Sequence, residues 1–296
     1  MAKQAIAKNG CGEDGDYDVA IIGAGIIGAA IYHRLASMGM RVVICDKTGI
    51  ASGTTGKSGG LITAASDFSF NYYQQFQHQV GIALTQRQLR VQQLGRKQMP
   101  AMTIDTQQAC HAWLSGATCL EGVAITQIVF AGGQWHLPEI KVRATQLILA
   151  NASDVFDLLQ QINQPFDAYV NSFQYLRFHH PDCDDIAYVE KDYFLIPTVH
   201  GEVIAGFFGR DKITRLTHID EKQQNDLLAL LPDYQAIPFT TEIAYDVYKR
   251  DTRQLVEYLP EKNVIIAAGY NAGGIKVAPE VAYQVGAYLH SVAVDG

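Results

Sequence analysis

Three glycines near the start of the chain have the spacing of a phosphate-binding turn. Gly23, Gly25 and Gly28 form a G-x-G-x-x-G pattern directly after a strand-like run, Asp18 to Ile22. In such a turn the first glycine permits the tight bend, the second lets the backbone approach a pyrophosphate, and the third lets a helix pack closely on the strand. The pattern predicts a dinucleotide site with its diphosphate at the positive end of the following helix.

An acidic residue follows at the distance that such a site requires. A helix is expected from Ile26 to Met38 and a second strand from Arg41 to Cys45, followed directly by Asp46. Asp46 comes 18 residues after Gly28 and is placed to accept hydrogen bonds from ribose hydroxyls. NAD and FAD both satisfy this pattern, so the glycines alone do not decide between them.

The composition is that of a folded protein with a substantial core. Of the 296 residues, 48% are hydrophobic and 18% are charged, and the formal net charge is −7. Because this acidic balance leaves no basic surplus for nucleic-acid phosphates, a nucleic-acid partner is not expected. The apolar run from Val19 to Ile31 is too short to span a membrane, and residues 1–16 are expected to form a disordered leader.

The cysteines and histidines indicate no metal site. The five cysteines, without a CxxC pair, are Cys11, Cys45, Cys110, Cys119 and Cys183. This spacing predicts neither a disulfide framework nor a zinc site, and it favours a reducing, cytoplasmic location. His179, His180 and Asp182 lack a second histidine pair at ligand spacing, so we interpret them as a surface turn.

The loop after Asp46, from Gly49 to Ile62, is small and rich in hydroxyl groups. It resembles the corresponding loop of the D-amino-acid oxidase superfamily of FAD-dependent oxidoreductases, which includes glycine oxidase and monomeric sarcosine oxidase. In that family the loop passes the flavin diphosphate and ribityl chain, a path that hydroxyls and backbone N–H groups suit. The resemblance assigns the following residues to FAD: Lys47, Ser52, Thr54, Thr55, Ser58, Gly59, Gly60 and Leu61.

Two segments in the middle of the chain carry the same resemblance. Gly122 to Leu137 is interpreted as a hairpin with a Gly132-Gly133 turn, in which Ile125 would offer backbone hydrogen bonds to the adenine. Ala144 to Ala152 is interpreted as a buried strand followed by a small-residue turn, with Ala150 and Asn151 beside the cofactor. Asn151 stands where the family usually has glycine, and asparagine tolerates the left-handed conformation better than most residues.

The C-terminal segment, Asn263 to Pro279, resembles the part of sarcosine-oxidase-like enzymes that completes the flavin site. It is expected to form a strand, a glycine loop and the start of a final helix that runs to His290. Backbone N–H groups and the positive end of this helix would face the flavin and stabilise negative charge on the reduced ring. The residues assigned to the cofactor here are Gly269, Gly273, Gly274, Ile275 and Lys276.

Four side chains are candidates for contact with a substrate. Lys276 falls where the sarcosine oxidase group has a lysine that binds the substrate carboxylate, and such an anchor would aim the α-hydrogen at the flavin. Lys57 is a second candidate anchor. Tyr193 and Tyr248 could line an amine pocket, although aromatic residues on strands also build cores.

Three positions depart from the family. Asp246 stands at or near the place of the arginine that clamps the carboxylate in D-amino-acid and glycine oxidases. Ala244 replaces the cysteine that attaches the flavin of sarcosine oxidase, so covalent attachment by that route is excluded. Ile204 stands where sarcosine oxidase places a lysine over the flavin for the reaction of the flavin with oxygen, and slow reaction with oxygen is therefore expected.

The family's members are longer, and the deficit falls mainly between Ile62 and Leu120. Within that region, residues 71–99 have apolar residues at helical spacing and are predicted to form one or two helices. The substrate lobe is therefore expected to be shortened, and its pocket shallow, open or completed by another subunit.

The predicted fold is α/β, with a Rossmann-like FAD-binding domain and a second, smaller α+β substrate lobe that has a mixed antiparallel sheet. The FAD-binding domain is expected at residues 17–70, 118–155 and 240–296, and the substrate lobe at 71–117 and 156–239.

The resemblance implies an enzyme with non-covalent FAD that oxidises the C–N bond of a small amino acid or secondary amine by hydride transfer to flavin N5. The resulting imine would hydrolyse in water. Two other functions stay open: a flavoprotein subunit or maturation factor that acts with a partner polypeptide, and a non-catalytic FAD-binding scaffold.

Overall fold

Strand β1 (Gly15–Ile22) lies in the parallel part of the first sheet, paired with β2 (Val42–Asp46) on one side and β9 (Val142–Leu149) on the other. The computed structural model describes residues 15–93, 95–207 and 216–295. The two strands expected first along the chain are confirmed. The predicted leader is wrong for Gly15 and Asp16, because they pair with β9; residues 1–14 lie outside the described residues.

The first sheet has eight strands in the order β15-β16-β9-β1-β2-β6, with β8 beside β9 and β7 beside β8. From β16 to β6 all neighbours are parallel, whereas β15, β7 and β8 are antiparallel to their neighbours. The remaining strands of this sheet are β6 Thr118–Glu121, β7 Val129–Ala131, β8 Gln134–Leu137, β15 Glu257–Leu259 and β16 Val264–Ile266.

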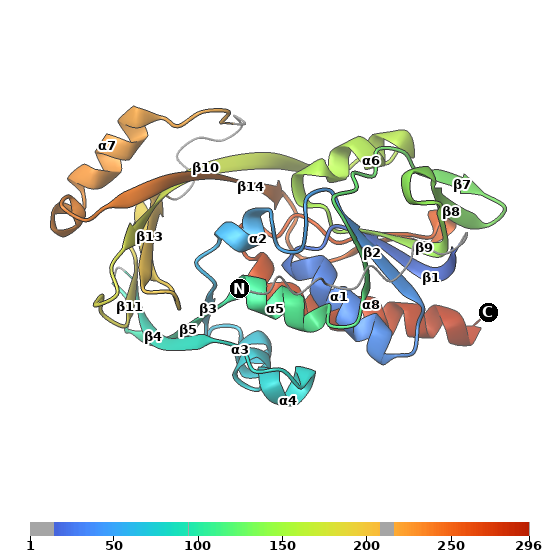
Figure 1. Cartoon of the computed structure of the whole chain (residues 1–296), viewed down its shortest axis with the longest axis horizontal. Coiled ribbons are helices and arrows are strands. Elements are labelled where there is room, and N and C mark those ends of the chain that lie inside the picture. The colour runs from blue at the N-terminus through green and yellow to red at the C-terminus, as the bar shows by residue number, and fades with distance from the viewer. Residues whose placement is uncertain (1–14, 94, 208–215, 296) are drawn as a thin grey trace, which may run out of the picture.

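Helices cover both faces of this sheet (Figure 1). The helices are α1 Ile26–Ser37, α2 Thr54–Lys57, α3 Asp67–Gln74, α4 Phe76–Val80, α5 Thr106–Trp113, α6 Val155–Gln161, α7 Glu221–Ala229 and α8 Gly274–Asp295. Short 3₁₀ turns are η1 Pro138–Ile140, η2 Ala152–Asp154, η3 Pro232–Tyr234 and η4 Pro260–Lys262. Helix α8 begins where the final helix was expected and ends five residues beyond the expected His290.

Side chains of β1 alternate between the two covered faces. Val19 and Ile21 pack in the cluster with α1, α5 and α8, whereas Ala20 and Ile22 pack with α6 and the β7–β8 hairpin. All four are buried. Burial on both faces explains why a central parallel strand has a continuous apolar sequence instead of an alternating one.

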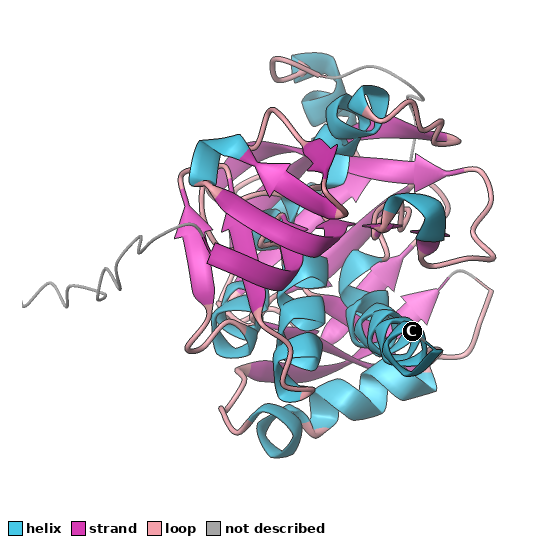
Figure 2. Ribbon diagram, turned by 90° about the vertical axis from the view of Figure 1, so that its right-hand side faces the viewer, coloured by secondary structure: helices cyan, strands magenta, loops and turns pink. Residues whose placement is uncertain are grey.

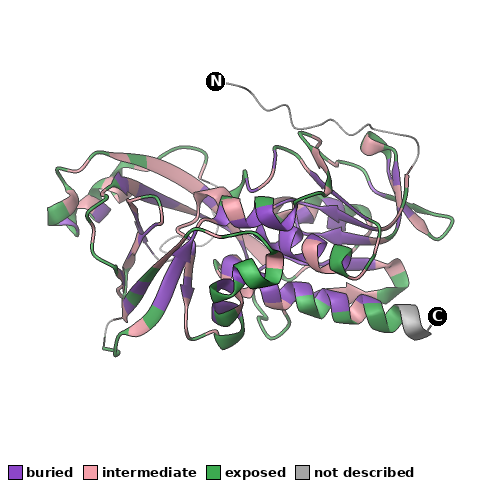
Figure 3. Cartoon of the chain, turned by 60° about the horizontal axis from the view of Figure 1, so that its bottom comes forward, coloured by how far each residue is buried: buried purple, intermediate pink, exposed green. Residues whose placement is uncertain are grey.

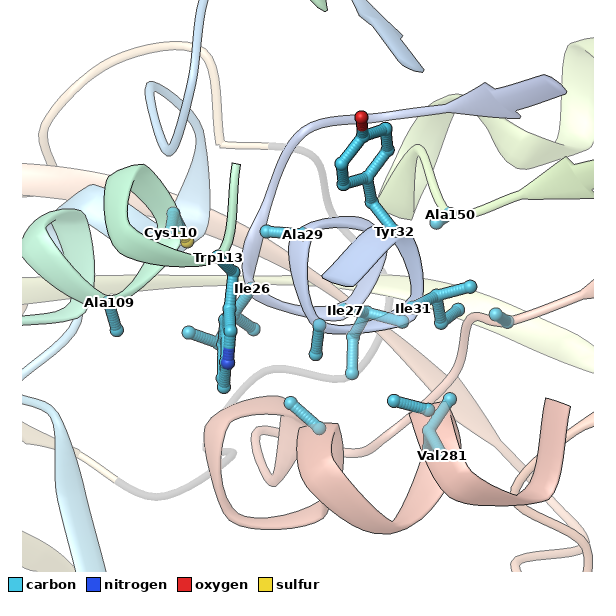
Figure 4. Close-up of a cluster of buried hydrophobic side chains, with 14 of the residues drawn as sticks. Ile26, Ile27, Ala29, Ile31, Tyr32, Ala109, Cys110, Trp113, Ala150 and Val281 are labelled. Carbon is cyan, nitrogen blue, oxygen red and sulfur yellow. The ribbon is translucent and has the colours of Figure 1, made fainter. Parts of the chain in front are cut away.

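The expected helix α1 is confirmed, and it is the centre of the larger core cluster. Figure 4 shows Ile26, Ile27 and Ile31 of α1 between Trp113 of α5 and Val281 of α8. Figure 2 shows α8 nearly end-on, in the helical layer below the strands. Figure 3 shows that α8 is buried along one face and exposed along the other, as expected for an amphipathic helix.

The second sheet also has eight strands, in the order β14-β10-β13-β12-β11-β4-β5-β3. Its neighbours are antiparallel except for β11 and β4, which confirms the mixed antiparallel lobe. Figure 1 shows β10 and β14 as a long pair that reaches towards the first sheet. Its strands are β3 Leu61–Thr63, β4 Gln86–Gln93, β5 Met99–Ile104, β10 Ala168–His179, β11 Ile186–Val189, β12 Tyr193–Pro197, β13 Glu202–Phe207 and β14 Phe239–Lys249.

The helical prediction for residues 71–99 is only half correct. Helices α3 and α4 are there, but residues 86–93 form strand β4. Leu89 and Val91 are buried while Gln88 and Arg90 are exposed, which is the period of a strand. Helical spacing matched the same apolar residues by chance, and pairing with β5 and β11 decided the conformation.

The predicted domain boundaries stay a proposal. Strands β3 and β14 fall within the ranges predicted for the FAD-binding domain, yet they hydrogen-bond into the second sheet. Helix α5 falls within the predicted substrate lobe, yet it packs on α1. Among the described residues, no helix has the length and apolar character needed to cross a membrane.

Candidate cofactor and substrate site

Residues of both sheets line a cavity of about 930 Å³. Ligand sites commonly have volumes of about 300–1,000 Å³, so this cavity has room for a large ligand and a small second molecule. The residues predicted to bind the cofactor that line it are Gly23, Gly25, Asp46, Lys47, Ser52, Thr54, Thr55, Ser58, Gly59, Leu61, Ile125, Ala150, Asn151, Gly269, Gly273, Gly274, Ile275 and Lys276.

Two predicted glycines, Gly28 and Gly60, lie outside the cavity lining and serve packing instead. A Cβ atom on Gly28 would lie 1.9 Å from the carbonyl oxygen of Gly23, so the predicted role of the third glycine in helix–strand packing is confirmed. At Gly60, φ is +69° and a Cβ would lie 2.2 Å from the carbonyl oxygen of Ile104. Gly60 therefore allows a turn against β5, and its contact with the cofactor stays a prediction.

The glycine turn after β1 contacts the turn after β9. Gly23 has φ of +108°, and a Cβ there would lie 2.5 Å from the carbonyl oxygen of Ala150. Helix α1 then begins without a side-chain cap on Gly25, and the Ile26 N–H donates instead to Thr55 Oγ1, at 3.1 Å. The positive end of α1 thus lies against the cavity beside the loop after β2.

Asp46 connects the glycine turn to that loop. Its Oδ2 accepts from the Ala24 N–H at 2.8 Å, and its Oδ1 accepts from the N–H groups of Thr48 and Gly49, at 3.0 and 3.1 Å. The prediction that Asp46 binds ribose hydroxyls stays a prediction. Because a carboxylate oxygen has two lone pairs, Oδ2 has capacity for one further donor.

Residues 122–128 form no strand, so the expected hairpin is correct only from Val129 onward. Its two-residue turn is as predicted, with positive φ at both Gly132 and Gly133. In the segment before the hairpin, the N–H groups of Thr126 and Gln127 donate to the carboxylate of Glu139, at 2.8 and 2.9 Å.

Ile125 lies next to a clamp, in which the side chains of Glu139 and Gln161 bind the backbone of residues 126–128. Gln161 completes the clamp, because its Nε2 donates to the Thr126 carbonyl at 2.7 Å and its Oε1 accepts from the Ile128 N–H at 3.1 Å. Among the described residues, the backbone N–H and C=O of Ile125 have no hydrogen-bond partner, and they are free for a base edge.

We expect Glu139→Gln to weaken FAD binding several-fold at pH 7, since an amide cannot accept as well from the donors of residues 126 and 127. Backbone and hydroxyl hydrogen bonds outweigh burial and lower the pKa of Glu139 below 4.5. The ionised carboxylate of Glu139 therefore contributes fully to the stability of the clamp at pH values above its ordinary pKa. This contribution is lost as the pH falls through the lowered pKa. Titration of the apoproteins with FAD between pH 7 and 4 should therefore show that the FAD affinities of wild type and variant become equal in acid. A difference in FAD affinity that stays the same at every pH would contradict the role of the clamp.

The turn after β9 differs from expectation. Asn151 has φ of −89°, and the positive φ belongs to Ala152, at 49°. The chain reverses one residue later than predicted because Asn151 starts the 3₁₀ turn η2 with its carbonyl bound by the Asp154 N–H. The Asn151 Oδ1 is buried, on a residue that lines the cavity, and has no partner among the described residues. Such a buried acceptor calls for a donor from a ligand.

Lys276 lies in the first turn of α8 and lines the cavity. Within the part of the chain that the structure describes, its ammonium makes no hydrogen bond or ion pair. The preceding loop is fixed at Gly269, with φ of +85°, where a Cβ would lie 2.2 Å from Cγ of Lys249. That lysine is itself buried and paired with Glu257 at 2.8 Å. Lys276 is thus a cation in the cavity wall that is open to a ligand.

Lys57, the second predicted anchor, also lines the cavity, but its ammonium is engaged. Its Nζ donates to the carbonyl of Ile243 on β14 at 2.8 Å. Its own carbonyl accepts from the Tyr175 hydroxyl at 2.8 Å and from Arg177 Nη2 at 3.1 Å. Lys57 therefore connects α2 to the second sheet.

The two predicted tyrosines have different positions. Tyr248 lines the cavity, and its ring stacks on Tyr169 at 5.7 Å between centroids. Tyr193 is not among the residues that line it, and its contact with substrate stays a prediction. It packs with Leu195 in the core beneath α7, because alternate residues of β12 face opposite sides and Phe194 and Ile196 are the ones that face the cavity.

The apolar wall of the cavity could not be identified before the strand register was known. It includes Phe173, Phe194, Ile196, Ile204 and Ala244 from the second sheet. Asp246 also lines the cavity, and its correspondence to the family's arginine stays a prediction. Alternation along β12 and β14 was the available signal, but only pairing in the sheet shows which side faces the site.

No described residues form a group of histidine, cysteine and acidic side chains suited to a metal ion. The four described cysteines are free: Cys45, Cys110, Cys119 and Cys183. The fifth, Cys11, lies outside the described residues.

Known proteins share both the sequence of the glycine region and the whole fold. Residues 18–114 match the family model of the DAO family, FAD dependent oxidoreductase. Over 53 residues the chain is 47% identical to glycine oxidase of Geobacillus kaustophilus (strain HTA426), a match that covers 18% of this chain and 14% of that protein.

Two solved structures extend the likeness along the chain. Glycine oxidase from Geobacillus kaustophilus has a TM-score of 0.77 at 16% identity, over 91% of this chain and 93% of that one. L-proline dehydrogenase from P. horikoshii has a TM-score of 0.80 at 15% identity, over 92% of each chain. At such identities the structures establish the fold.

The residues present fit FAD. The glycine turn would be closed by a Cβ at Gly23, the backbone of Ile125 is free for a base, and the buried Oδ1 of Asn151 requires a donor. These three features lie along one cavity with the positive ends of α1 and α8. Residues 18–114 thus match the model of the DAO family of FAD-dependent oxidoreductases, and the described residues of the chain have the fold of glycine oxidase.

Proposed function

We propose that this protein oxidises the C–N bond of a small amino acid or secondary amine. Bound FAD supplies the acceptor for the hydride that leaves the α-carbon, and water then hydrolyses the imine product. The observation that carries the proposal is Lys276, a cation without a protein partner among the described residues, in the wall of a cavity that is otherwise largely apolar.

Each part of the cavity has a role in this reaction. The turn at Gly23 and Gly25 and the start of α1 would hold the diphosphate, and Asp46 and Ile125 would hold the ribose and the adenine. The N-terminal end of α8, with Gly273 and Gly274, would face the flavin.

Lys276 would bind the substrate carboxylate and so orient the α-hydrogen. The apolar side chains of Phe194, Ile196 and Ile204 would exclude water from the reacting atoms, which strengthens the Lys276–carboxylate attraction. Ala244 lines the same wall, and the absence of a cysteine there agrees with non-covalent FAD.

Anaerobic titration with glycine, sarcosine, proline and D- and L-amino acids, followed in the visible spectrum, tests the proposal. We expect one of these compounds to bleach the flavin band. Lys276→Met should raise the concentration needed for half-maximal bleaching about tenfold or more, because a charged hydrogen bond contributes about 1.5–3 kcal/mol. Lys276→Arg keeps the charge and should raise this concentration much less.

The other outcomes separate the alternatives. A yellow protein that nothing in the panel reduces would contradict catalysis by the chain alone. Two functions would then remain, a non-catalytic FAD-binding scaffold and a flavoprotein that acts with a partner polypeptide. Gel filtration with co-purifying proteins would distinguish these two. A protein that cannot be loaded with FAD would contradict the cofactor assignment.

A further inference from the structure

Asp246 places a carboxyl group on the wall of the cavity. It lies on β14, and its Oδ1 accepts from the Val247 N–H at 2.9 Å while its Oδ2 accepts from the Ala272 N–H at 2.5 Å. These bonds hold the group in one orientation but bring no positive charge to it. Among the described residues, no lysine, arginine or histidine lies within ion-pair distance of Asp246.

Such a carboxylate is complementary to a cation. Burial is the largest influence on Asp246 and raises its pKa, and the two backbone N–H groups offset this only in part. Each carboxylate oxygen can accept a further hydrogen bond. A ligand that brings both positive charge and N–H donors would relieve the cost of the buried charge.

Asp246 and Lys276 belong to adjoining segments. Ala272, whose N–H binds Asp246, precedes the first turn of α8, and Lys276 lies in that turn. Both side chains line one cavity, and neither has a partner of opposite charge among the described residues. An uncompensated carboxylate and an uncompensated ammonium in one cavity match a ligand that carries both charges.

Tyr248 adds to this match. It lies two residues beyond Asp246 on β14, so the two side chains lie on the same face of the strand, and it also lines the cavity. An aromatic ring beside a carboxylate favours an ammonium group through its negative face.

We propose that Asp246 binds the ammonium group of the substrate and takes one proton from it, while Lys276 binds its carboxylate. This inference rests on the proposed function and narrows the substrate to zwitterionic amino acids, including N-alkyl ones. In the step an N–H bond of the ammonium breaks and an O–H bond forms on Asp246, which leaves a neutral amine and no change in oxidation state. The neutral amine is the form whose α-carbon can give up hydride.

The other ionisable groups around Asp246 are less suited to take this proton. The lysines and tyrosines that line the cavity are Lys47, Lys57, Tyr175, Tyr245, Tyr248, Tyr270 and Lys276. Lys47 is paired with Asp154, and burial raises the pKa of the Tyr270 hydroxyl, so that it stays protonated at neutral pH. Lys57 and Lys276 are cations, and the hydroxyls of Tyr175 and Tyr245 already donate to the carbonyls of Lys57 and Leu216. Burial raises the pKa of the Tyr248 hydroxyl, so it stays protonated at neutral pH.

Two isosteric probes test the charge recognition without any reaction. Trimethylglycine carries a permanent cation and a carboxylate, whereas 3,3-dimethylbutanoate has carbon in place of the nitrogen. By calorimetry on the FAD-loaded protein, wild type should bind trimethylglycine about tenfold more tightly or better. Asp246→Asn should bring the two affinities within about threefold, Asp246→Glu should keep the preference, and Lys276→Met should weaken both probes.

A matched control is Asp157→Asn, which removes a carboxylate from an exposed residue of the same cavity lining. It should leave the preference unchanged. Equal affinities in wild type, a preference that survives Asp246→Asn, or no binding of trimethylglycine would each overturn the proposal. Flavin content and the urea midpoint of each variant show whether it is folded.

The pH dependence of anaerobic flavin reduction tests the proton transfer, with the amino acid that bleaches the flavin. In Asp246→Asn, flavin reduction should be about a hundredfold slower than in wild type at pH 7. This difference in rate should shrink as the pH approaches the pKa of the ammonium group of the free amino acid. A loss equal at every pH would overturn the proton transfer. If no compound reduces the flavin while the probes behave as expected, the proposed oxidation fails and the binding site stands.

Discussion

Gly23→Ala is expected to abolish FAD binding and to lower the free energy of unfolding by about 3–5 kcal/mol. Two independent costs add at this position. The backbone has φ of +108°, which disfavours any L side chain, and the new Cβ would lie 2.5 Å from the Ala150 carbonyl oxygen and 2.8 Å from Cα of Asn151. The turns after β1 and β9 would have to move apart, and both line the cavity.

Gly39→Ala is the matched control for this substitution. Gly39 also has positive φ, at +81°, but a Cβ there meets nothing within 4 Å. It should cost only about 1–2 kcal/mol and leave FAD binding intact. Urea unfolding and the flavin content of the purified proteins measure both effects. Equal losses in the two variants would show that backbone strain alone, and not the contact of the two turns, limits Gly23.

Arg177→Met is expected to lower the free energy of unfolding by about 2–4 kcal/mol, somewhat less than for a fully buried pair because the groups are partly exposed. Arg177 Nη1 lies 2.6 Å from Glu202 Oε2, and its Nε lies 2.9 Å from Glu242 Oε1. The side chains of these three residues are 16%, 26% and 27% exposed. The variant would leave two carboxylates facing each other across β10, without their cation.

The same substitution should also loosen FAD. Arg177 Nη2 donates to the carbonyl of Lys57, and Tyr175 binds both that carbonyl and Glu242. This network connects α2, which lines the cavity, to three strands of the second sheet. We expect FAD affinity to fall several-fold, measured by titration of the apoprotein.

Arg253→Met provides the comparison for Arg177. Arg253 pairs with Asp251 at 2.6 Å, but the two side chains are 88% and 54% exposed. Solvent screens such a pair, so its removal should change the urea midpoint by no more than the error of the measurement. A similar loss in the two arginine variants would contradict the view that partial burial makes the Arg177 network stabilising.

The first unit of the fold could be predicted from sequence because its signals are local. A buried strand, a glycine turn, a helix and a second strand follow one another over residues 15–46, and each was found within a few residues of its expected bounds. The C-terminal strand and helix were predicted for the same reason. In each case the apolar run and the glycine next to it determine the local conformation whatever lies across the sheet.

Strand β4 shows where local signals fail. Leu89 is one of the apolar residues on which the helical prediction rests, whereas Leu89 and Val91 together show strand alternation. Its partners β5 and β11 come later in the chain, and one of them is more than 90 residues away. Pairing at such a separation is a tertiary event that a short window of sequence does not encode.

The sequence by itself determined which residue types the candidate site contains: a glycine turn at Gly23 and Gly25, an acid at Asp46 and a cation at Lys276. Only the tertiary structure decided which side chains meet. It placed Tyr193 against the core beneath α7 and Phe194 towards the cavity, and it paired the ammonium of Lys57 with the Ile243 carbonyl. The reason is that residue types follow from local sequence, whereas the face of a strand and the partner of a charge depend on packing between segments far apart in the chain.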